Sequence, residues 1–376
     1  FRTILPRFLL AMLAANYASA YVGKWFIESP YCVNFTGDLT IENLVPVFWK
    51  MVYVLFFITL IVEFPFFVAV LYKRKWLIPK AVATTLIIHC ISYYLLFHFY
   101  GGTHRINMVT ECEVVTVDQM QTDQKYDLYY ISADGKKVMK SDLNGMNRET
   151  IVELDEGDFP DRLFACPKCT EKVENREYGV FERPCSDSDY DLFIFIRKGK
   201  ERLETPREER LLIENFTSQS SIEMGWLGEY RGGWDGTWHK ESETVMNYGR
   251  ASEVDCDSKW EYWVGYWPDD GIRGAELKED HPPDDNTFNK YKEGSHFRFF
   301  IETPIAQWKA RNAAHISGDY AVFQLGKDQI CILQPQEKKI ALITRGFGPV
   351  VAVKHAPVSE TIPDTKEPGT SPEPTP

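Results

Sequence analysis

The sequence predicts two regions of different fold class, a group of membrane-spanning α-helices followed by an all-β domain. Three observations support this prediction. The first 100 residues hold three long apolar stretches, and residues 108–355 alternate short apolar runs with turn signals. The charge also changes sign between the regions. Residues 1–100 contain 8 Lys and Arg and 4 Asp and Glu; subtracting these from the totals of 42 and 54 leaves 34 and 50, a net charge of −16, for residues 101–376.

The apolar stretches run over residues 8–26, 47–72 and 78–100. Each has close to the roughly 20 residues that a helix needs to cross a bilayer. The middle stretch carries a single charge, Glu63. Core helices of a soluble protein are the alternative, but three such stretches in succession favour membrane helices. We therefore expect residues 1–107 to form a bundle of three transmembrane helices.

Basic residues in the short connections predict the orientation, because Lys and Arg concentrate in cytoplasmic loops. The connection 73–80 contains four of them, whereas the loop 27–46 contains three acids and no Lys or Arg. The connection 73–80 is therefore expected in the cytoplasm and the loop 27–46 outside. Everything after Tyr100 then lies outside, which predicts a multi-pass protein of the cell membrane with a periplasmic or extracellular C-terminal domain.

The first stretch has a second interpretation. Arg2 and Arg7, an apolar run and the small residues 18–20 also resemble a signal peptide. An internal repeat favours the helix instead. At an offset of 73 residues, Asn16 aligns with His89 and Tyr21 with Tyr94, so the first stretch looks like a copy of the third. A copy of the second helix would then be expected before Phe1.

The β region contains one specific pattern. Residues 127–138 alternate as a strand, turn at Asp134-Gly135 and return, and a second turn follows at Asn144-Gly145 before Arg148. This resembles a blade of the YWTD β-propellers of the LDL-receptor family, whose pattern is L-Y-W-T-D, a turn, then L-D-G-x-x-R. The sequence departs from that pattern at residues 130–132, where Tyr-Ile-Ser replaces the W-T-D portion.

The resemblance implies a β-propeller. Weaker copies of the same strand order occur at 191–213 and 319–343, and residues 108–355 would hold five or six blades of about 40 residues. The whole chain is similar in layout to bacterial-type multi-pass membrane proteins with an extracytoplasmic propeller-like domain. An irregular β-sandwich is the alternative. Residues 356–376, rich in Pro, Thr, Ser and Glu, are expected to be disordered.

Seven cysteines fall in segments expected outside the cytoplasm, where disulfides form. The odd number leaves at least one unpaired or paired between chains. Cys331 lies between two isoleucines in a strand pattern and is expected to be a buried thiol. Cys166 and Cys169 form a C-x-x-C with Cys185 nearby, but a second C-x-x-C is missing. A disulfide from Cys185 to Cys166 or Cys169 is therefore favoured over a zinc site, and no metal is predicted.

Two further groups of residues are candidates for function. Aromatic residues crowd residues 226–267, where they form either a packed core or a surface for a protein or glycan partner: Trp226, Tyr230, Trp234, Trp238, Trp260, Trp263 and Trp267. In the apolar stretches, Asn16, Glu63 and His89 each lie nine residues from a cytoplasmic end. They predict a polar layer at one depth, which either holds the helices together or acts in transport.

The sequence contains none of the common enzyme motifs, such as G-x-S-x-G, H-E-x-x-H or a P-loop. No catalytic residue or cofactor is therefore predicted. The acidic domain is a poor match for nucleic acid, so the expected partners are membrane lipid and a protein or glycan outside the cytoplasm. The first hypothesis is a membrane-anchored binding or scaffold protein. The second is a membrane subunit of a transport or signalling assembly, in which the polar layer is active.

Overall fold

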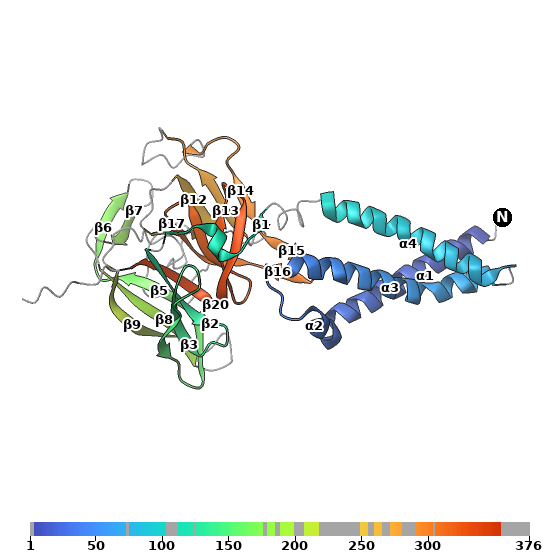
Figure 1. Ribbon diagram of the computed structural model, residues 1–376, viewed down its shortest axis with the longest axis horizontal. Coiled ribbons are helices and arrows are strands. Elements are labelled where there is room, and N and C mark those ends of the chain that lie inside the picture. Colours follow the sequence, from blue (N-terminus) through green and yellow to red (C-terminus); the bar gives the residue numbers. More distant parts are fainter. Residues whose placement is uncertain are drawn as a thin grey trace, which may run out of the picture.

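Three long helices form one end of the molecule and a β-rich domain forms the other (Figure 1). The computed structural model describes residues 4–72, 75–102, 112–123, 125–175, 179–184, 189–198, 207–217, 249–254, 259–264, 271–279, 290–303 and 305–354. Helices α1 (Ile4–Glu28), α3 (Leu44–Leu71) and α4 (Leu77–Gly102) run alongside one another, and the short α2 (Pro30–Thr36) lies at the end nearest the β domain.

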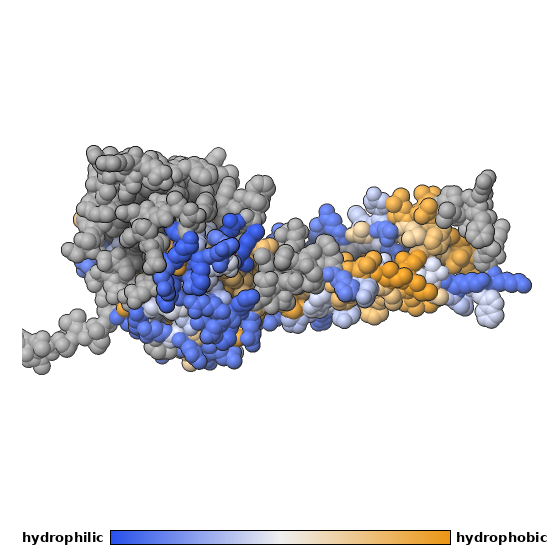
Figure 2. Space-filling view, turned by 90° about the horizontal axis from the view of Figure 1, so that it is seen from above, coloured by the Kyte–Doolittle hydropathy of each residue, from blue (hydrophilic) through white to orange (hydrophobic). Residues whose placement is uncertain are grey.

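The prediction of three membrane spans is wrong in number. Among the described residues, two helices are long and apolar enough to cross a membrane, α3 and residues 77–98 of α4. Helix α1 does form over the first predicted stretch, but its sequence mixes Arg7, Asn16 and Lys24 with many small residues. Helix α1 is long enough to cross a membrane, but its composition is not apolar enough. Figure 2 shows apolar side chains concentrated over the helices and hydrophilic ones over the described part of the β domain.

Small and polar residues at a spacing of four form the seam between the helices. Helix α1 buries Ala15 and Ser19, and α4 buries Ala81, Thr85 and His89. Residues four apart lie on one face of a helix, and small side chains let helix backbones approach closely. Both α1 and α4 pack on α3, which is therefore the central helix of the three.

The loop predicted over residues 27–46 contains α2 and ends inside the β domain. Ser29 caps α2, since its hydroxyl accepts a hydrogen bond from the Cys32 amide at 3.4 Å, and Pro30 occupies the first turn. Ile41 and Leu44, each 1% exposed, then pack into a core of the β domain. The Ile41 amide donates to the side-chain oxygen of Gln329 at 2.8 Å. The chain thus anchors the start of α3 in the β domain.

The largest sheet has nine strands and curls into a half barrel. Eight follow one another across the sheet, and the ninth, β1 (Glu113–Val114), pairs in parallel with β20. The order of the eight is β11 (Ser252–Val254), β17 (Ala310–Ile316), β18 (Tyr320–Leu325), β19 (Gln329–Gln334), β20 (Lys339–Val353), β2 (Tyr126–Ser132), β3 (Lys137–Asp142) and β4 (Glu149–Glu153).

This sheet replaces the predicted propeller, which is wrong. The reason is β20, a 15-residue strand that pairs with β19 along its first part and with β2 along its second. A propeller blade is a separate four-stranded sheet, whereas β20 joins the first and third predicted units into one sheet. Gly346 and Gly348 lie where β20 crosses between partners, and an added Cβ there would meet Tyr130 at 2.5 Å or the Arg162 backbone at 2.8 Å.

Smaller sheets complete the domain. The second predicted unit forms a three-stranded sheet of β5 (Asp158–Pro167), β8 (Tyr190–Lys198) and β9 (Arg207–Thr217). Two hairpins are formed by β6 (Thr170–Asn175) with β7 (Gly179–Pro184), and by β15 (Ile301–Thr303) with β16 (Ala306–Trp308). A four-stranded sheet contains β10 (Gly249–Arg250), β12 (Trp260–Val264), β13 (Ile272–Glu276) and β14 (Phe297–Phe299).

The middle of the large sheet is buried on both faces. On β19, Ile330 and Ile332 belong to one core, whereas Cys331 and Leu333 belong to the other. Successive residues of a strand point to opposite faces, so an uninterrupted apolar run is typical of a strand covered on both sides. The expectation for Cys331 is confirmed: it is a free thiol, fully buried, and burial raises its pKa.

The turn at residues 142–148 has a local reason for its sequence. The Asp142 carboxylate accepts hydrogen bonds from the Met146 amide at 2.8 Å and the Asn147 side chain at 3.0 Å. The Arg148 guanidinium donates to the Gly145 carbonyl at 2.8 Å. Gly145 itself has φ +69°, which favours glycine. The residues that carry the YWTD resemblance therefore stabilise the β3–β4 hairpin.

Gly145→Ala should destabilise the domain more than Gly135→Ala. Both glycines have a left-handed φ, which costs a non-glycine residue about 1–2 kcal/mol. An alanine Cβ at 145 would also lie 2.6 Å from the Ile343 carbonyl oxygen, whereas at 135 its nearest neighbour is Pro160 at 3.6 Å. Thermal unfolding of both variants would measure the difference. Equal shifts in the unfolding temperature would contradict the backbone clash at 145.

Candidate functional site

The buried carboxylate Glu63 is the centre of the candidate site. It lies in the C-terminal half of α3, and its residue is 3% exposed although the helix around it is apolar. Burying an unpaired carboxylate costs several kcal/mol, so such a group requires partners. The site is therefore defined by the side chains that α1 and α4 bring to this position.

Both neighbouring helices supply a partner. The Ser19 hydroxyl of α1 donates a hydrogen bond to Oε1 of Glu63 at 2.6 Å. From α4, His89 Nε2 contacts Oε2 of Glu63 at 3.2 Å, and His89 is itself 3% exposed. The two oxygens of one carboxylate thus each face a different helix. This Ser19–Glu63–His89 group connects all three long helices through side chains.

Asn16, one of the three residues of the predicted polar layer, does not belong to the buried group. Glu63 and His89 meet, but Asn16 is exposed on α1 and Ser19 takes its place. Successive residues of a helix are separated by about 100°, and the buried face of α1 runs through Ala15 and Ser19. Asn16 points away from that face. Its backbone still contributes, because the Asn16 carbonyl lies 3.1 Å from the Ser19 hydroxyl.

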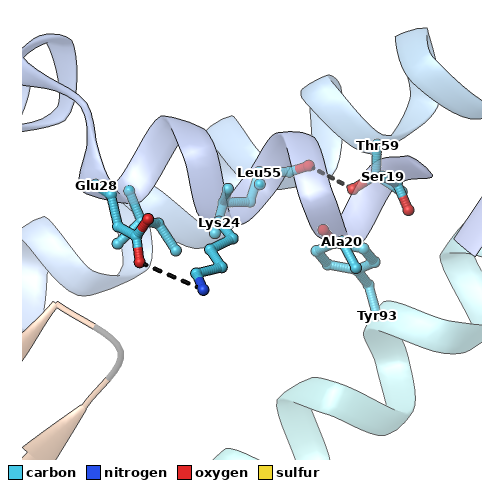
Figure 3. A pocket seen from close by; sticks show the side chains of 9 residues that line it. Ser19, Ala20, Lys24, Glu28, Leu55, Thr59 and Tyr93 are labelled. Carbon is cyan, nitrogen blue, oxygen red and sulfur yellow. Dashed lines mark hydrogen bonds and ion pairs between the residues drawn. The ribbon is translucent and has the colours of Figure 1, made fainter. Parts of the chain in front are cut away.

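A groove extends from this group toward the β-domain end of the helices (Figure 3). Its volume is about 430 Å³, and α1, α3 and α4 all contribute to its walls. Ser19, Thr59 and Tyr93 give it polar side chains at one end, and Lys24 with Glu28 at the other, where they form an ion pair at 3.7 Å. Ser19 therefore belongs both to the groove wall and to the buried group.

The helices and the β domain share packed side chains. Phe48 and Val52, near the start of α3, form a small core with Trp49 and with Phe97 of α4. Ile305, at the tip of the β15–β16 hairpin, packs against the same core. The rings of Trp49 and Phe97 stack with centroids 5.0 Å apart. Together with Ile41 and Leu44, this contact makes α3 part of both regions.

The aromatic cluster divides between the core and segments that are not described. Trp260 is 6% exposed and stacks on Tyr262 in a core of the β domain. Trp263 is half-buried, with its ring 5.8 Å from that of Tyr291. The other candidates lie outside the described residues: Trp226, Tyr230, Trp234, Trp238 and Trp267. Of the two placed tryptophans, only Trp263 has surface for a ligand.

The described cysteines give no evidence for a metal site. Cys32, Cys90 and Cys331 are free thiols. Cys169 is disulfide-bonded, so it is not available as a zinc thiolate. The side chains of Cys166 and Cys185 lie outside the described residues, and a pairing of Cys185 stays a prediction. Within the described part of the chain, no group of three His, Cys, Asp or Glu side chains is placed to hold a metal ion.

Comparison with known proteins adds no family. No protein-family model matches the chain, and no curated protein matches it. The resemblance of residues 127–148 to the YWTD repeat accordingly stays a prediction of the sequence. The features that bear on function are the Ser19–Glu63–His89 group, the groove and their connection to the β domain.

Replacing Glu63 should show what the buried group contributes to stability. Glu63→Leu removes the Ser19 bond and the His89 contact, so we expect the free energy of unfolding to fall by about 1–2 kcal/mol. Glu63→Gln keeps a hydrogen-bonding side chain and should lose less. Asn16→Leu is the matched control, since it removes an exposed polar side chain one turn from Ser19. Denaturant unfolding in detergent measures all three, and an Asn16→Leu effect as large as that of Glu63→Leu would contradict this assignment.

Proposed function

We propose that the chain is a membrane subunit of a transport or signalling assembly. In this proposal α3 and α4 cross the membrane, and the β-rich domain lies outside the cytoplasm. The Ser19–Glu63–His89 group is the part that responds to a proton or ligand. The observation that carries the proposal is the buried Glu63–His89 contact, because an ionisable pair within apolar helices is a candidate functional site by default.

The exposure of the helices supports a membrane location. Only 11% of the most apolar window of α3 and 17% of that of α4 are buried. A core helix of a soluble protein would bury such side chains, and large exposed apolar patches mark contact with a membrane or another protein. Lys73, Arg74, Lys75 and Lys80 lie in or beside the connection between α3 and α4, and the enrichment of basic residues in cytoplasmic loops supports the orientation.

The packing between helices and β domain favours this function over binding alone. A protein that only anchors a binding domain needs no packed connection between the two. Here Leu44 is buried in the β domain and Ile305 is packed on the helices. A change around Glu63 would therefore be transmitted along α3. The binding or scaffold hypothesis, with a protein or glycan partner, rests on aromatic residues of which most lie outside the described residues.

Orientation is tested by chemical labelling in intact cells. Met146 on the β domain and Trp76 beside α4 are 64% and 76% exposed, so cysteines at both positions should be reachable. An impermeant thiol reagent should label Met146→Cys but label Trp76→Cys only after the cells are opened. Peptide mass mapping separates these labels from any on native Cys90. Labelling of Trp76→Cys alone in intact cells would reverse the proposed orientation.

Coupling is tested by hydrogen exchange. Glu63→Gln removes the charge at the centre of the group, and the resulting shift of α3 should change amide exchange at residues 38–45 and 301–308. Asn16→Gln, an exposed change of similar chemistry, should alter neither segment. Mass spectrometry of peptides from the protein in lipid nanodiscs provides the measurement. If Glu63→Gln changes exchange only within the helices, the helices are an anchor and the binding or scaffold function is favoured.

A further inference from the structure

We infer that the groove is a one-sided path by which protons reach Glu63 from the side of the β domain. This inference rests on the proposed function and names its substrate as the proton. It depends on three features of the helices: a groove with polar side chains at both ends that reaches Ser19, a hydroxyl that connects the groove to the carboxylate, and apolar packing beyond Glu63.

The groove is suited to water. Its volume of about 430 Å³ leaves room for on the order of ten water molecules. Five of its nine lining residues carry polar side chains, and a bridging water requires several polar partners. Thr59 lies one turn of α3 from Glu63, and Tyr93 lies one turn of α4 from His89. Polar side chains therefore lie at both ends of the groove, Lys24 and Glu28 at the outer end and Ser19, Thr59 and Tyr93 at the end nearer Glu63 (Figure 3).

Ser19 connects the groove to the carboxylate. Its hydroxyl has one proton and two acceptors in reach, Oε1 of Glu63 at 2.6 Å and the Asn16 carbonyl oxygen at 3.1 Å. When Glu63 is ionised, Ser19 donates to it. When Glu63 is protonated, its O–H donates to Ser19, and Ser19 donates to Asn16 instead. Both arrangements satisfy the same oxygen positions, so the proton can be exchanged without movement of the helices.

The step conserves protons and electrons. A hydronium ion in the groove loses a proton, which passes by way of Ser19 to Oε1 of Glu63, so an O–H bond breaks in the ion and one forms on the carboxyl group. The products are a water molecule and a neutral Glu63. His89 is the only titratable side chain in direct contact with the carboxylate among the described residues. The other titratable groups that face the groove are Tyr93, Lys24 and Glu28.

The opposite side of Glu63 is closed by apolar packing. One turn further along α3, Phe67 is 2% exposed, and its ring lies 6.1 Å from that of Phe8. On α1 and α4, the next turns bury Ala15 and Ala81 completely. Among the described side chains, the one polar group buried there is Thr85, whose hydroxyl donates to the Ala81 carbonyl within its own helix, as the Thr59 hydroxyl on the groove side does to the Leu55 carbonyl. The described side chains thus leave no chain of polar groups from Glu63 toward the α3–α4 connection.

Cysteine accessibility tests the path. Ser19→Cys and Gly23→Cys place thiols on the groove wall, and Ala15→Cys places one on the sealed side, one turn away. The full-length protein in sealed vesicles is treated with a small charged methanethiosulfonate, which reacts with thiolates and so reports water. Added on the β-domain side, it should label Ser19→Cys at least about tenfold faster than Ala15→Cys. Peptide mapping identifies the labelled residue.

The alternatives give different results. Labelling of Ser19→Cys by an apolar maleimide but not by the charged reagent would show that lipid fills the groove and overturn the inference. Faster labelling of Ala15→Cys from the opposite side would overturn the one-sided path. If Ala15→Cys does not fold, Phe67→Cys takes its place on the sealed side. The coupling measured by hydrogen exchange uses another readout, so the proposed function can fail while this path is found, or stand while it is not.

Discussion

Burial of the Glu63 carboxylate is the constraint on which the arrangement of the helices depends. The free energy needed to bury a lone carboxylate in an apolar environment is larger than most single contacts provide. Such a group is therefore tolerated only when its oxygens have partners. Ser19 hydrogen-bonds one oxygen from α1, and His89 of α4 lies 3.2 Å from the other. The need to bring both within reach fixes which faces of α1 and α4 turn toward α3, and small residues on the same faces allow the approach. A polar requirement thus specifies the packing of otherwise apolar helices.

Helix α3 carries that constraint into the β domain. Its first residue is buried in a β core, its next turns pack against Ile305 of the β15–β16 hairpin, and its C-terminal half contains Glu63. A helix is stiff over this length because its backbone hydrogen bonds are internal. The first turns of α3 therefore pack against side chains of the β domain. The Ile41 amide, bonded to Gln329 on β19, extends the connection to the centre of the large sheet.

The sequence predicted local structure well and long-range pairing poorly. The strands around Asp134-Gly135 and Asn144-Gly145 form as predicted, because hairpin turns are encoded by adjacent residues. The pairing of β2 with β20 joins residues more than 200 positions apart, as at Tyr126 and Val353. Nothing in either strand distinguishes that partner from a strand of the same blade. The local pattern therefore fits a propeller blade, and only the pairing of β2 with β20 excludes it.

The same distinction applies to the candidate site. Glu63 and His89 could be found from sequence, since ionisable residues are rare in apolar stretches. Ser19 was missed because serine is common in membrane helices and carries no charge. A helical projection gives the missing signal: Ala15, Ser19 and Gly23 recur every four residues on one face of α1, which leaves Asn16 off that face. The internal repeat pointed to Asn16 because alignment compares positions along the chain and not directions around the helix.

One-sided access to a buried carboxylate has a physical consequence for the whole molecule. Protonation changes Glu63 from an acceptor of hydrogen bonds into a donor, and it removes the charge that faces His89. Ser19 adjusts by rotating its hydroxyl, but His89 has no such freedom, because its ring is buried between helices. The change is therefore expressed mainly at the α3–α4 contact. That contact continues through the stacked rings of Trp49 and Phe97 to Ile305. The α3–α4 contact, and not the α1 side, is accordingly the element through which the state of Glu63 would reach the β domain.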